Sequence, residues 1–349
     1  MDKVLMKGNE AIAEAAIRAN CRHFFGYPIT PQTEISAYMA KRMSKVGGTF
    51  LQAESEVAAI NMVYGAAGAG VRVMTSSSSP GISLKMEGLS YIAGADLPCV
   101  IVNIVRAGPG LGGIQPAQSD YFQAVKGGGH GDYRMIVIAP SSIQETVDCT
   151  IDAFDLADKY RMPVMLMGDG MLGQMMEPVS FPEVKTDHLP KKDWATTGTK
   201  MKRKANIINS LYIHPEELEE VILKREEKYN TIYETEVKYH TEGLENADVV
   251  LVAYGTTARI AKAAIALAKQ NGIKAGLIRP ITLWPFPTDI IAKTAPNVKC
   301  MISVEMSTGQ MVEDIRLAVN GVCPVHFYGR TGGAVPTPTA IFEQIRRYA

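Results

Sequence analysis

Several residues that could take part in chemistry lie where a predicted strand gives way to a helix. In the segment FFGYPITPQTE, Thr30 is followed by Pro31, the order expected at a helix N-cap and first helical position. Capping alone could account for Thr30. Its hydroxyl could instead contact a substrate, because ligands of parallel α/β proteins bind at the carboxyl ends of the strands.

Two acidic residues, Glu54 and Glu56, occupy a second strand-to-helix junction in the segment LQAESEVAAINMVYGAAGAG. Acidic residues at a helix N-terminus ordinarily interact with the helix dipole, which contributes about 0.3 to 1 kcal/mol. The spacing alone does not select either residue as catalytic.

An arginine and a run of small hydroxyl residues are further candidates for a functional site. Arg106 ends the apolar segment PCVIVNIV, where its guanidinium could bind a carboxylate through two hydrogen bonds. A surface arginine leaving a strand is the simpler interpretation. The hydroxyls of TSSSSPG, residues 75–81, could likewise cap the next helix or line a pocket.

Two familiar motifs are incomplete. The glycines of GPGLGG, residues 108–113, match a dinucleotide fingerprint, but Pro109 and Pro116 flank the point where the required helix would begin. We expect a close-packed loop there. Gly168-Asp169-Gly170 resembles the start of the diphosphate and magnesium motif of thiamine enzymes, but no asparagine ends a following strand, which indicates a turn.

The elements that position these residues alternate helices with short buried strands, a rhythm typical of a parallel sheet covered on both faces. A linker follows, and then an amphipathic helix with Leu218, Ile222, Tyr229 and Ile232 at helical spacing. This helix could cover part of a domain or contact another subunit. A second α/β unit begins at Ala247. The predicted strands are residues 23–26, 49–52, 71–75, 99–105, 135–139 and 163–167 in the first unit, and residues 247–255, 275–278, 300–304 and 325–328 in the second.

The predicted fold class is therefore α/β, with a doubly wound parallel-sheet domain over residues 1–180, a linker and connecting helix over 181–246, and a second domain over 247–349. We expect Thr256 or Thr257 to cap the helix that opens the second domain, and Asn271-Gly272 to end it.

The composition excludes several classes of partner. Lysine plus arginine and aspartate plus glutamate each total 36, so the formal net charge is zero and no field gathers nucleic acid or an anionic membrane. The five dispersed cysteines predict buried, reduced thiols in a cytoplasmic protein without a metal or cluster site on this chain. No signal peptide or membrane-spanning run is evident.

Taken together, eight blocks in this order resemble the alpha subunit of 2-oxoacid:ferredoxin oxidoreductases, particularly the members that act on 3-methyl-2-oxobutanoate. The blocks are KGNEAIAEAAIRA, GYPITP, QAESEVAAINMVYGAA, TSSSSPGISLKMEG, RAGPGLGGIQPAQSD, GGGHGDYR, VEMSTGQM and GRTGGAVPTP. The likeness spans nearly the whole chain.

This resemblance implies a pyrimidine-binding domain for thiamine diphosphate, followed by a transketolase C-terminal-like domain. A beta-type partner would supply the diphosphate and Mg²⁺ site and a [4Fe-4S] cluster, with gamma and ferredoxin-like delta subunits completing the complex. The implied reaction converts a branched-chain 2-oxoacid, coenzyme A and oxidised ferredoxin into acyl-CoA, CO2 and reduced ferredoxin.

The resemblance also implies roles for individual residues. Glu56, nine residues before Gly65, would bind the pyrimidine nitrogen N1′ and promote loss of the C2 proton. Thr30 and Arg106 would bind the substrate, and Ser78 and Gly81 the cofactor.

Three alternatives stay open at this point. A 2-oxoglutarate enzyme would need a second cation for the distal carboxylate, for which Lys85 is a candidate. A nicotinamide-dependent dehydrogenase would need a true fingerprint at residues 108–113. A non-catalytic subunit would not require Glu56.

Overall fold

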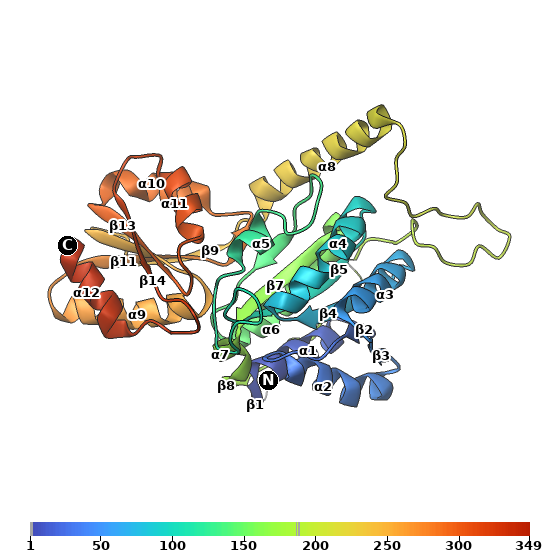
Figure 1. The fold of residues 1–349 in the computed structure, drawn as a ribbon, viewed down its shortest axis with the longest axis horizontal. Helices are drawn as coiled ribbons and strands as arrows, with labels where there is room; N and C mark the ends of the chain where they lie inside the picture. Colours follow the sequence, from blue (N-terminus) through green and yellow to red (C-terminus); the bar gives the residue numbers. More distant parts are fainter. Residues whose placement is uncertain (1–2, 186, 188) are drawn as a thin grey trace.

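The computed structural model describes residues 3–185, 187 and 189–349, and its centre is a seven-stranded sheet in the order β12-β6-β7-β5-β4-β2-β3 (Figure 1). Neighbouring strands are parallel except at the edge, where β12 runs antiparallel to β6. The predicted α/β class and all six predicted strands are confirmed. The seven strands of this sheet are β2 (His23–Gly26), β3 (Thr49–Gln52), β4 (Val73–Ser77), β5 (Cys99–Val105), β6 (Ile136–Ile138), β7 (Pro163–Asp169) and β12 (Thr282–Trp284).

Helices that follow these strands cover the sheet, as expected for a doubly wound domain (Figure 1). The first helix packs against the second and the sixth, and the third packs against the fourth. Their bounds are α1 (Gly8–Arg18), α2 (Thr33–Met43), α3 (Glu56–Gly68), α4 (Ser79–Gly94), α5 (Tyr121–Val125), α6 (Ile143–Tyr160) and α7 (Gly170–Gln174), with a short 3-10 helix at Ser44–Val46.

The contact between α3 and α4 is close because Gly88 lacks a side chain. A Cβ atom at Gly88 would lie 2.5 Å from Cγ2 of Ile60, closer than real contacts allow. One turn earlier on α3 lies Glu56, so this glycine contact brings the start of α3 against α4.

The second unit has a five-stranded sheet in the order β14-β13-β10-β11-β9, parallel except for the β9 edge. A separate apolar cluster lies between this sheet and two helices, α9 and α12, which pack together. The four predicted strands are present. The elements are β9 (Tyr239–Glu242), β10 (Val249–Val252), α9 (Gly255–Gln270), β11 (Ala275–Pro280), α10 (Thr288–Thr294), β13 (Cys300–Glu305), α11 (Met311–Val319), β14 (Val325–Gly329) and α12 (Pro338–Tyr348), with a 3-10 helix at Ala295–Asn297.

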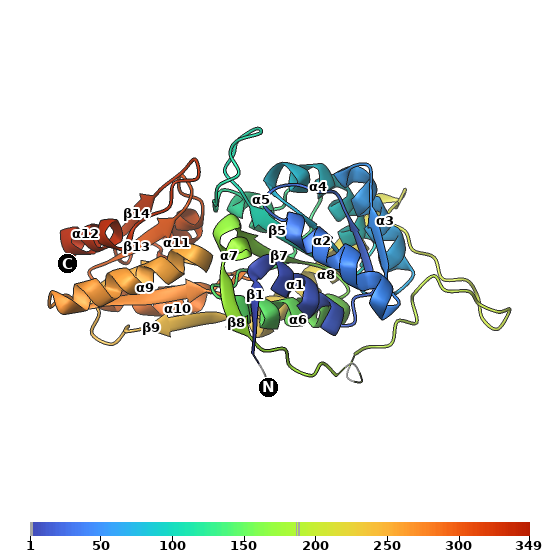
Figure 2. The same cartoon turned by 90° about the horizontal axis from the view of Figure 1, so that it is seen from below.

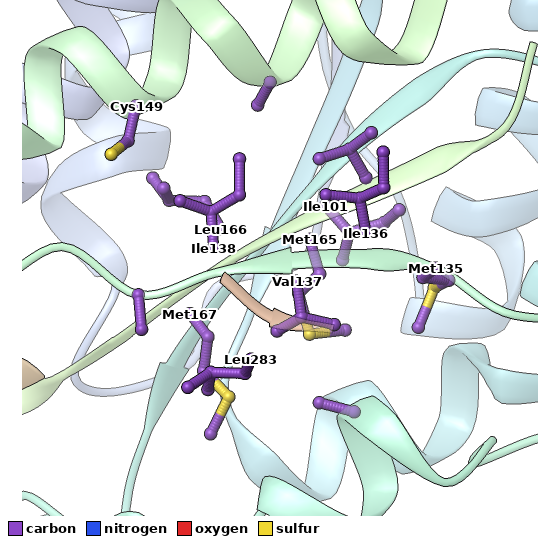
Figure 3. Packing of buried hydrophobic residues seen from close by; sticks show 14 of the residues in the cluster. Ile101, Met135, Ile136, Val137, Ile138, Cys149, Met165, Leu166, Met167 and Leu283 are labelled. Atoms are coloured by element: carbon purple, nitrogen blue, oxygen red, sulfur yellow. The ribbon is translucent and has the colours of Figure 1, made fainter. Parts of the chain in front are cut away.

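Four short strands, β1, β8, β9 and β12, were absent from the sequence-based prediction. β1 (Val4–Lys7) pairs with β8 (Met176–Val179) in a small antiparallel sheet. β12 comes from the second half of the chain but joins the first sheet, so Leu283 packs with Val137, Met165 and Met167 of the first core (Figure 3). The two halves of the chain therefore share one hydrophobic core.

The connecting helix α8 (Pro215–Thr235) confirms the amphipathic helix predicted after the linker, although its burial is uneven. Tyr229 and Ile232 are buried, and the Tyr229 ring packs edge-on against Trp284, whereas Leu218 is 36% exposed. Residues 197–205, which precede α8 in the chain, form a loop that extends away from the body in both views (Figures 1 and 2). The N-terminal half of α8 is mostly exposed.

Two predicted caps are wrong. Thr30 does not cap α2, because residues 29–32 first form a turn in which Gln32 N donates to Ile29 O, and the helix begins at Thr33. The helix α9 begins at Gly255 and its N-cap residue is Tyr254, so Thr256 and Thr257 lie inside its first turn rather than at its cap. The predicted end of α9 at Asn271 is confirmed.

The five cysteines are buried free thiols, as predicted. Within the described ranges, no cluster of His, Cys, Asp or Glu is arranged to hold a metal ion. The described helices include none that is both long and apolar enough to cross a membrane.

Candidate cofactor and substrate site

Glu56 is the first residue of α3 and the first component of the site. Ser55 caps this helix, and its Oγ accepts a hydrogen bond of 3.1 Å from Ala58 N. The structure separates the two acidic residues of this junction, since Glu56 is only 6% exposed and Glu54 points to solvent. Only Glu56 is therefore placed to act inside the protein.

The Glu56 carboxylate lies against the first turn of α4. A Cβ atom at Gly81 would lie 2.5 Å from Glu56 Oε1 and still closer to Ser77 Oγ, so only glycine fits here. Ser78 is the N-cap residue of α4, but its side chain makes no capping bond. The hydroxyls of Ser77 and Ser78 are buried and lack partners among the described residues. Buried polar groups normally bind something, so these two indicate a place for a polar ligand.

A buried network continues from α4 to the end of β5. Ser79 Oγ donates to an Asp120 carboxylate oxygen at 2.7 Å and accepts from Arg106 N at 3.1 Å. Asn103 Nδ2 also donates to Asp120. Burial raises the pKa of Asp120 above its usual value, and the hydrogen bonds from Asn103 and Ser79 oppose that shift. This network fixes the backbone from which the Arg106 side chain starts.

Arg106 is buried rather than a surface arginine, because it joins two loops. Its guanidinium donates to Thr30 O at 3.0 Å and to Leu111 O at 3.2 Å, while its Nε has no partner in the described part of the chain. Thr30 itself is exposed, and its backbone carbonyl is the atom that contacts this arginine. The two residues predicted to bind substrate are thus directly connected.

The glycine-rich segment after Arg106 is a loop, as predicted. No helix begins between Ala107 and Asp120, so the geometry of a dinucleotide fingerprint is absent from this loop. Leu111 is 86% exposed at the tip of this loop. Gly168-Asp169-Gly170 is not a simple turn, because Asp169 Oδ1 accepts from Met171 N and Leu172 N and thereby caps α7.

The second unit of the chain anchors the far end of the same loop. The side chain of Gln118 donates to Tyr254 O at 2.9 Å and accepts from Met306 N at 3.0 Å. Gly333, in the block GRTGGAVPTP, lies so close to Gln115 that a Cβ atom there would collide with it. The blocks near the end of the sequence therefore hold the loop that follows Arg106.

Two residues of the site were not identified correctly from the sequence. Gln32 was not proposed as a site residue, and Lys85 was proposed only as a cation for the second carboxylate of 2-oxoglutarate. Gln32 is fully buried, accepts a 2.5 Å hydrogen bond from Ser76 Oγ and donates to Tyr27 O, which fixes the turn that carries Thr30. Lys85 is also fully buried, with Nζ donating to Thr75 Oγ1 at 3.0 Å. The available signal for Lys85 was a charged residue in a helix whose other residues are mostly small or apolar.

Comparisons with known proteins agree with this geometry. Residues 14–246 match the family described as pyruvate flavodoxin/ferredoxin oxidoreductase, thiamine diphosphate-binding, and residues 247–341 match the pyruvate:ferredoxin oxidoreductase core domain II. The chain is 52% identical to the ketoisovalerate oxidoreductase subunit VorB of Methanothermobacter marburgensis, over 99% of this chain and 97% of that protein. It is 33% identical to the 2-oxoglutarate synthase subunit KorA of Methanothermobacter thermautotrophicus, over 99% and 98% of the two chains.

A solved structure is similar over the whole chain. The 2-oxoglutarate:ferredoxin oxidoreductase from Magnetococcus marinus superposes with a TM-score of 0.88 at 28% identity, covering 99% of this chain and 65% of that one. This chain therefore spans somewhat less than two thirds of the solved chain. The family match over both units, together with the 52% identity along the chain, shows that this protein belongs to the thiamine diphosphate-binding 2-oxoacid:ferredoxin oxidoreductase family.

Proposed function

We propose that this chain is the alpha-type subunit of an oxidoreductase that acts on 3-methyl-2-oxobutanoate. The reaction takes the 2-oxoacid, coenzyme A and two oxidised ferredoxins, and it yields the branched acyl-CoA, CO2, one proton and two reduced ferredoxins. The observation that carries this proposal is the buried Glu56 carboxylate, which lies against Gly81 beside two unpartnered serine hydroxyls.

The residues around Glu56 fit the pyrimidine end of thiamine diphosphate. A flat ring can approach the backbone where a side chain is missing, and Gly81 leaves that opening. The ring nitrogen and amino group require polar partners, which Glu56, Ser77 and Ser78 offer. When bound, thiamine diphosphate supplies a nucleophilic carbon and an electron sink for decarboxylation.

Each residue of this chain then has a definite task. Glu56 holds a proton at the pyrimidine nitrogen N1′, Ser78 binds a polar edge of the ring, and Gly81 gives it space. Arg106 and Thr30, joined by the bond from the guanidinium to Thr30 O, orient the substrate carboxylate and the oxo group. Arg106 Nε is the donor that remains free of a protein partner among the described residues.

The remaining components belong to partner chains in this proposal. Asp169 is occupied in capping α7, so it is not free to bind Mg²⁺ and the diphosphate. We assign Mg²⁺, the diphosphate and a [4Fe-4S] cluster to a beta-type partner, with gamma and ferredoxin-like delta subunits in the same cytoplasmic complex. The names of the curated relatives, each a subunit, support a multisubunit enzyme.

The preference for a branched-chain substrate has two supports. The identity to the ketoisovalerate oxidoreductase subunit is 52%, against 33% to the 2-oxoglutarate synthase subunit. In addition, Lys85 is fully buried and donates a hydrogen bond to Thr75, so it is not available to bind the second carboxylate of 2-oxoglutarate.

The test is a substrate comparison with the complex assembled from this chain and its partner subunits. We expect coenzyme A-dependent reduction of ferredoxin with 3-methyl-2-oxobutanoate at a kcat/KM at least tenfold above that with 2-oxoglutarate. The isolated chain should be colourless and should bind thiamine diphosphate weakly. A preference for 2-oxoglutarate, or iron in the isolated chain, would contradict the proposal.

A further inference from the structure

Lys85 is a fully buried lysine in the middle of α4, one turn after Gly81. Residues four apart lie on the same face of a helix, and their side chains lean toward its N-terminus. The Lys85 side chain therefore runs toward the turn that contacts Glu56. Its ammonium has three hydrogens to donate. Thr75 Oγ1 is the one acceptor that it finds in the described structure.

The packing of α3 on α4 places Lys85 between two contact points. Gly81 meets the Glu56 carboxylate and Gly88 meets Ile60, and Lys85 lies between these glycines on α4. β4 contributes only the neutral Thr75 hydroxyl to the ammonium. The other buried acid near the start of α4, Asp120, is held by Ser79 and Asn103.

The Glu56 carboxylate interacts electrostatically with the Lys85 ammonium. Burial lowers the pKa of Lys85 from 10.5 to about 8, and the electrostatic effect of Glu56 opposes this shift by favouring the ammonium form. The attraction is mutual, because a cation that is stabilised by a carboxylate stabilises that carboxylate equally.

We propose that Lys85 is a positioning residue of the reaction, whose buried ammonium stabilises the carboxylate form of Glu56 and so favours transfer of the Glu56 proton to N1′ of bound thiamine diphosphate. In this step the O–H bond of Glu56 breaks and the N1′–H bond forms, while Lys85 keeps its own proton. The inference rests on the proposed role of Glu56.

Exchange of the cofactor C2 proton for deuterium tests this without turnover. The complex with its partner subunit is loaded with thiamine diphosphate, and exchange is quenched in acid and read by NMR between pH 6 and 9.5. We expect Lys85→Met to slow exchange at least tenfold at pH 6.5. The ratio of wild-type to variant rates should fall toward one above pH 8, where Lys85 itself becomes neutral.

Lys228→Met is the matched control, because Lys228 is also a largely buried lysine whose pKa burial lowers, but it pairs with Asp96 beyond the opposite end of α4. The ratio of the wild-type to the Lys228→Met exchange rate should stay near one at every pH. Lys85→Gln, a second neutral replacement, should reproduce Lys85→Met, and it keeps the test usable if methionine disturbs the fold.

The outcomes separate this inference from the function on which it rests. A Lys85→Met ratio near one, or a ratio that does not change with pH, overturns the role of Lys85 when Glu56→Gln still abolishes exchange. Wild-type exchange in Glu56→Gln overturns the role of Glu56 and, with it, that of Lys85. A Lys85 effect of the same size in the Glu56→Gln background would show that Lys85 does not act through Glu56.

Discussion

Oε1 of Glu56 and the Cα of Gly81 are so close that a single methyl group cannot be placed between them: a Cβ atom at Gly81 would lie 2.5 Å from that oxygen. The two residues are 25 positions apart in sequence and belong to neighbouring helices, α3 and α4. Their contact fixes the direction in which the carboxylate points. It also makes the site sensitive to changes that add very few atoms.

Gly81→Ala should therefore weaken thiamine diphosphate binding to the assembled complex at least tenfold, which corresponds to about 1.4 kcal/mol. The new methyl group would displace the Glu56 carboxylate and the Ser77 hydroxyl. Calorimetric titration of the complex with the cofactor measures the change.

Gly65→Ala is the control, since no atom lies within 4 Å of a Cβ at this helical position. That variant should bind cofactor normally and gain about 0.5 to 1 kcal/mol in stability, because alanine favours a helix more than glycine does. Equal cofactor affinity of the Gly81→Ala and Gly65→Ala complexes would show that Gly81 is not part of the cofactor site.

Arg106→Lys should lower kcat/KM for the 2-oxoacid at least tenfold, mainly through a higher KM. Lysine keeps the charge, but its single nitrogen replaces the two guanidinium nitrogens that bond Thr30 O and Leu111 O separately, and it lacks the planar fork that binds a carboxylate. Steady-state kinetics of the complex gives the split between kcat and KM. Limited proteolysis should also cut the loop around the exposed Leu111 faster than in the wild type. Unchanged kinetics would leave Arg106 with only a structural role.

Much of the fold could be predicted because the buried strands are continuous apolar runs. β5 was predicted with its observed bounds, and its seven residues are all buried. β12 was missed because its three residues gain their stability from pairing with β6, more than 140 positions earlier, and no local pattern reveals such a pairing. The same holds for β1, whose partner β8 lies more than 160 positions later in the chain.

The site was predicted in part. The register of Glu56 followed from the family resemblance, and the structure shows what local patterns could not, namely that Glu54 faces solvent and Glu56 does not. The burial of Lys85 depends on how closely α3 and α4 approach at Gly88, which is a property of the packed pair rather than of either helix. The bond from Arg106 to Thr30 O likewise depends on a turn that the sequence suggested was already helical.

Lys85→Met should make the isolated chain more stable at pH 7, by about 3 kcal/mol if each pKa unit corresponds to about 1.4 kcal/mol. The Lys85 ammonium loses its proton near pH 8 when folded and at about 10.5 when unfolded. Between these values the unfolded state binds more protons, so wild-type stability rises with pH through that window. Lys85→Met has no ionisable group at this position, so its stability lacks this dependence on pH.

Urea unfolding of both proteins at pH 7 and pH 10 measures that difference. The stability gap should be large at pH 7 and should narrow at pH 10. Destabilisation by Lys85→Met at pH 7 would instead indicate that Lys85 stabilises the fold, and would count against a role in tuning Glu56.

The central claim is that the Glu56 carboxyl group controls the proton at N1′ of the cofactor. The most direct measurement compares C2 hydrogen–deuterium exchange of bound thiamine diphosphate in Glu56→Gln and Glu54→Gln complexes at pH 7. Glutamine preserves the shape of each side chain but cannot give up or accept the proton. We expect Glu56→Gln to slow exchange at least a hundredfold with the fold intact, and the solvent-exposed Glu54→Gln to exchange at the wild-type rate. Normal exchange in Glu56→Gln, with loss of exchange in Glu54→Gln, would contradict the account and move the site by two residues.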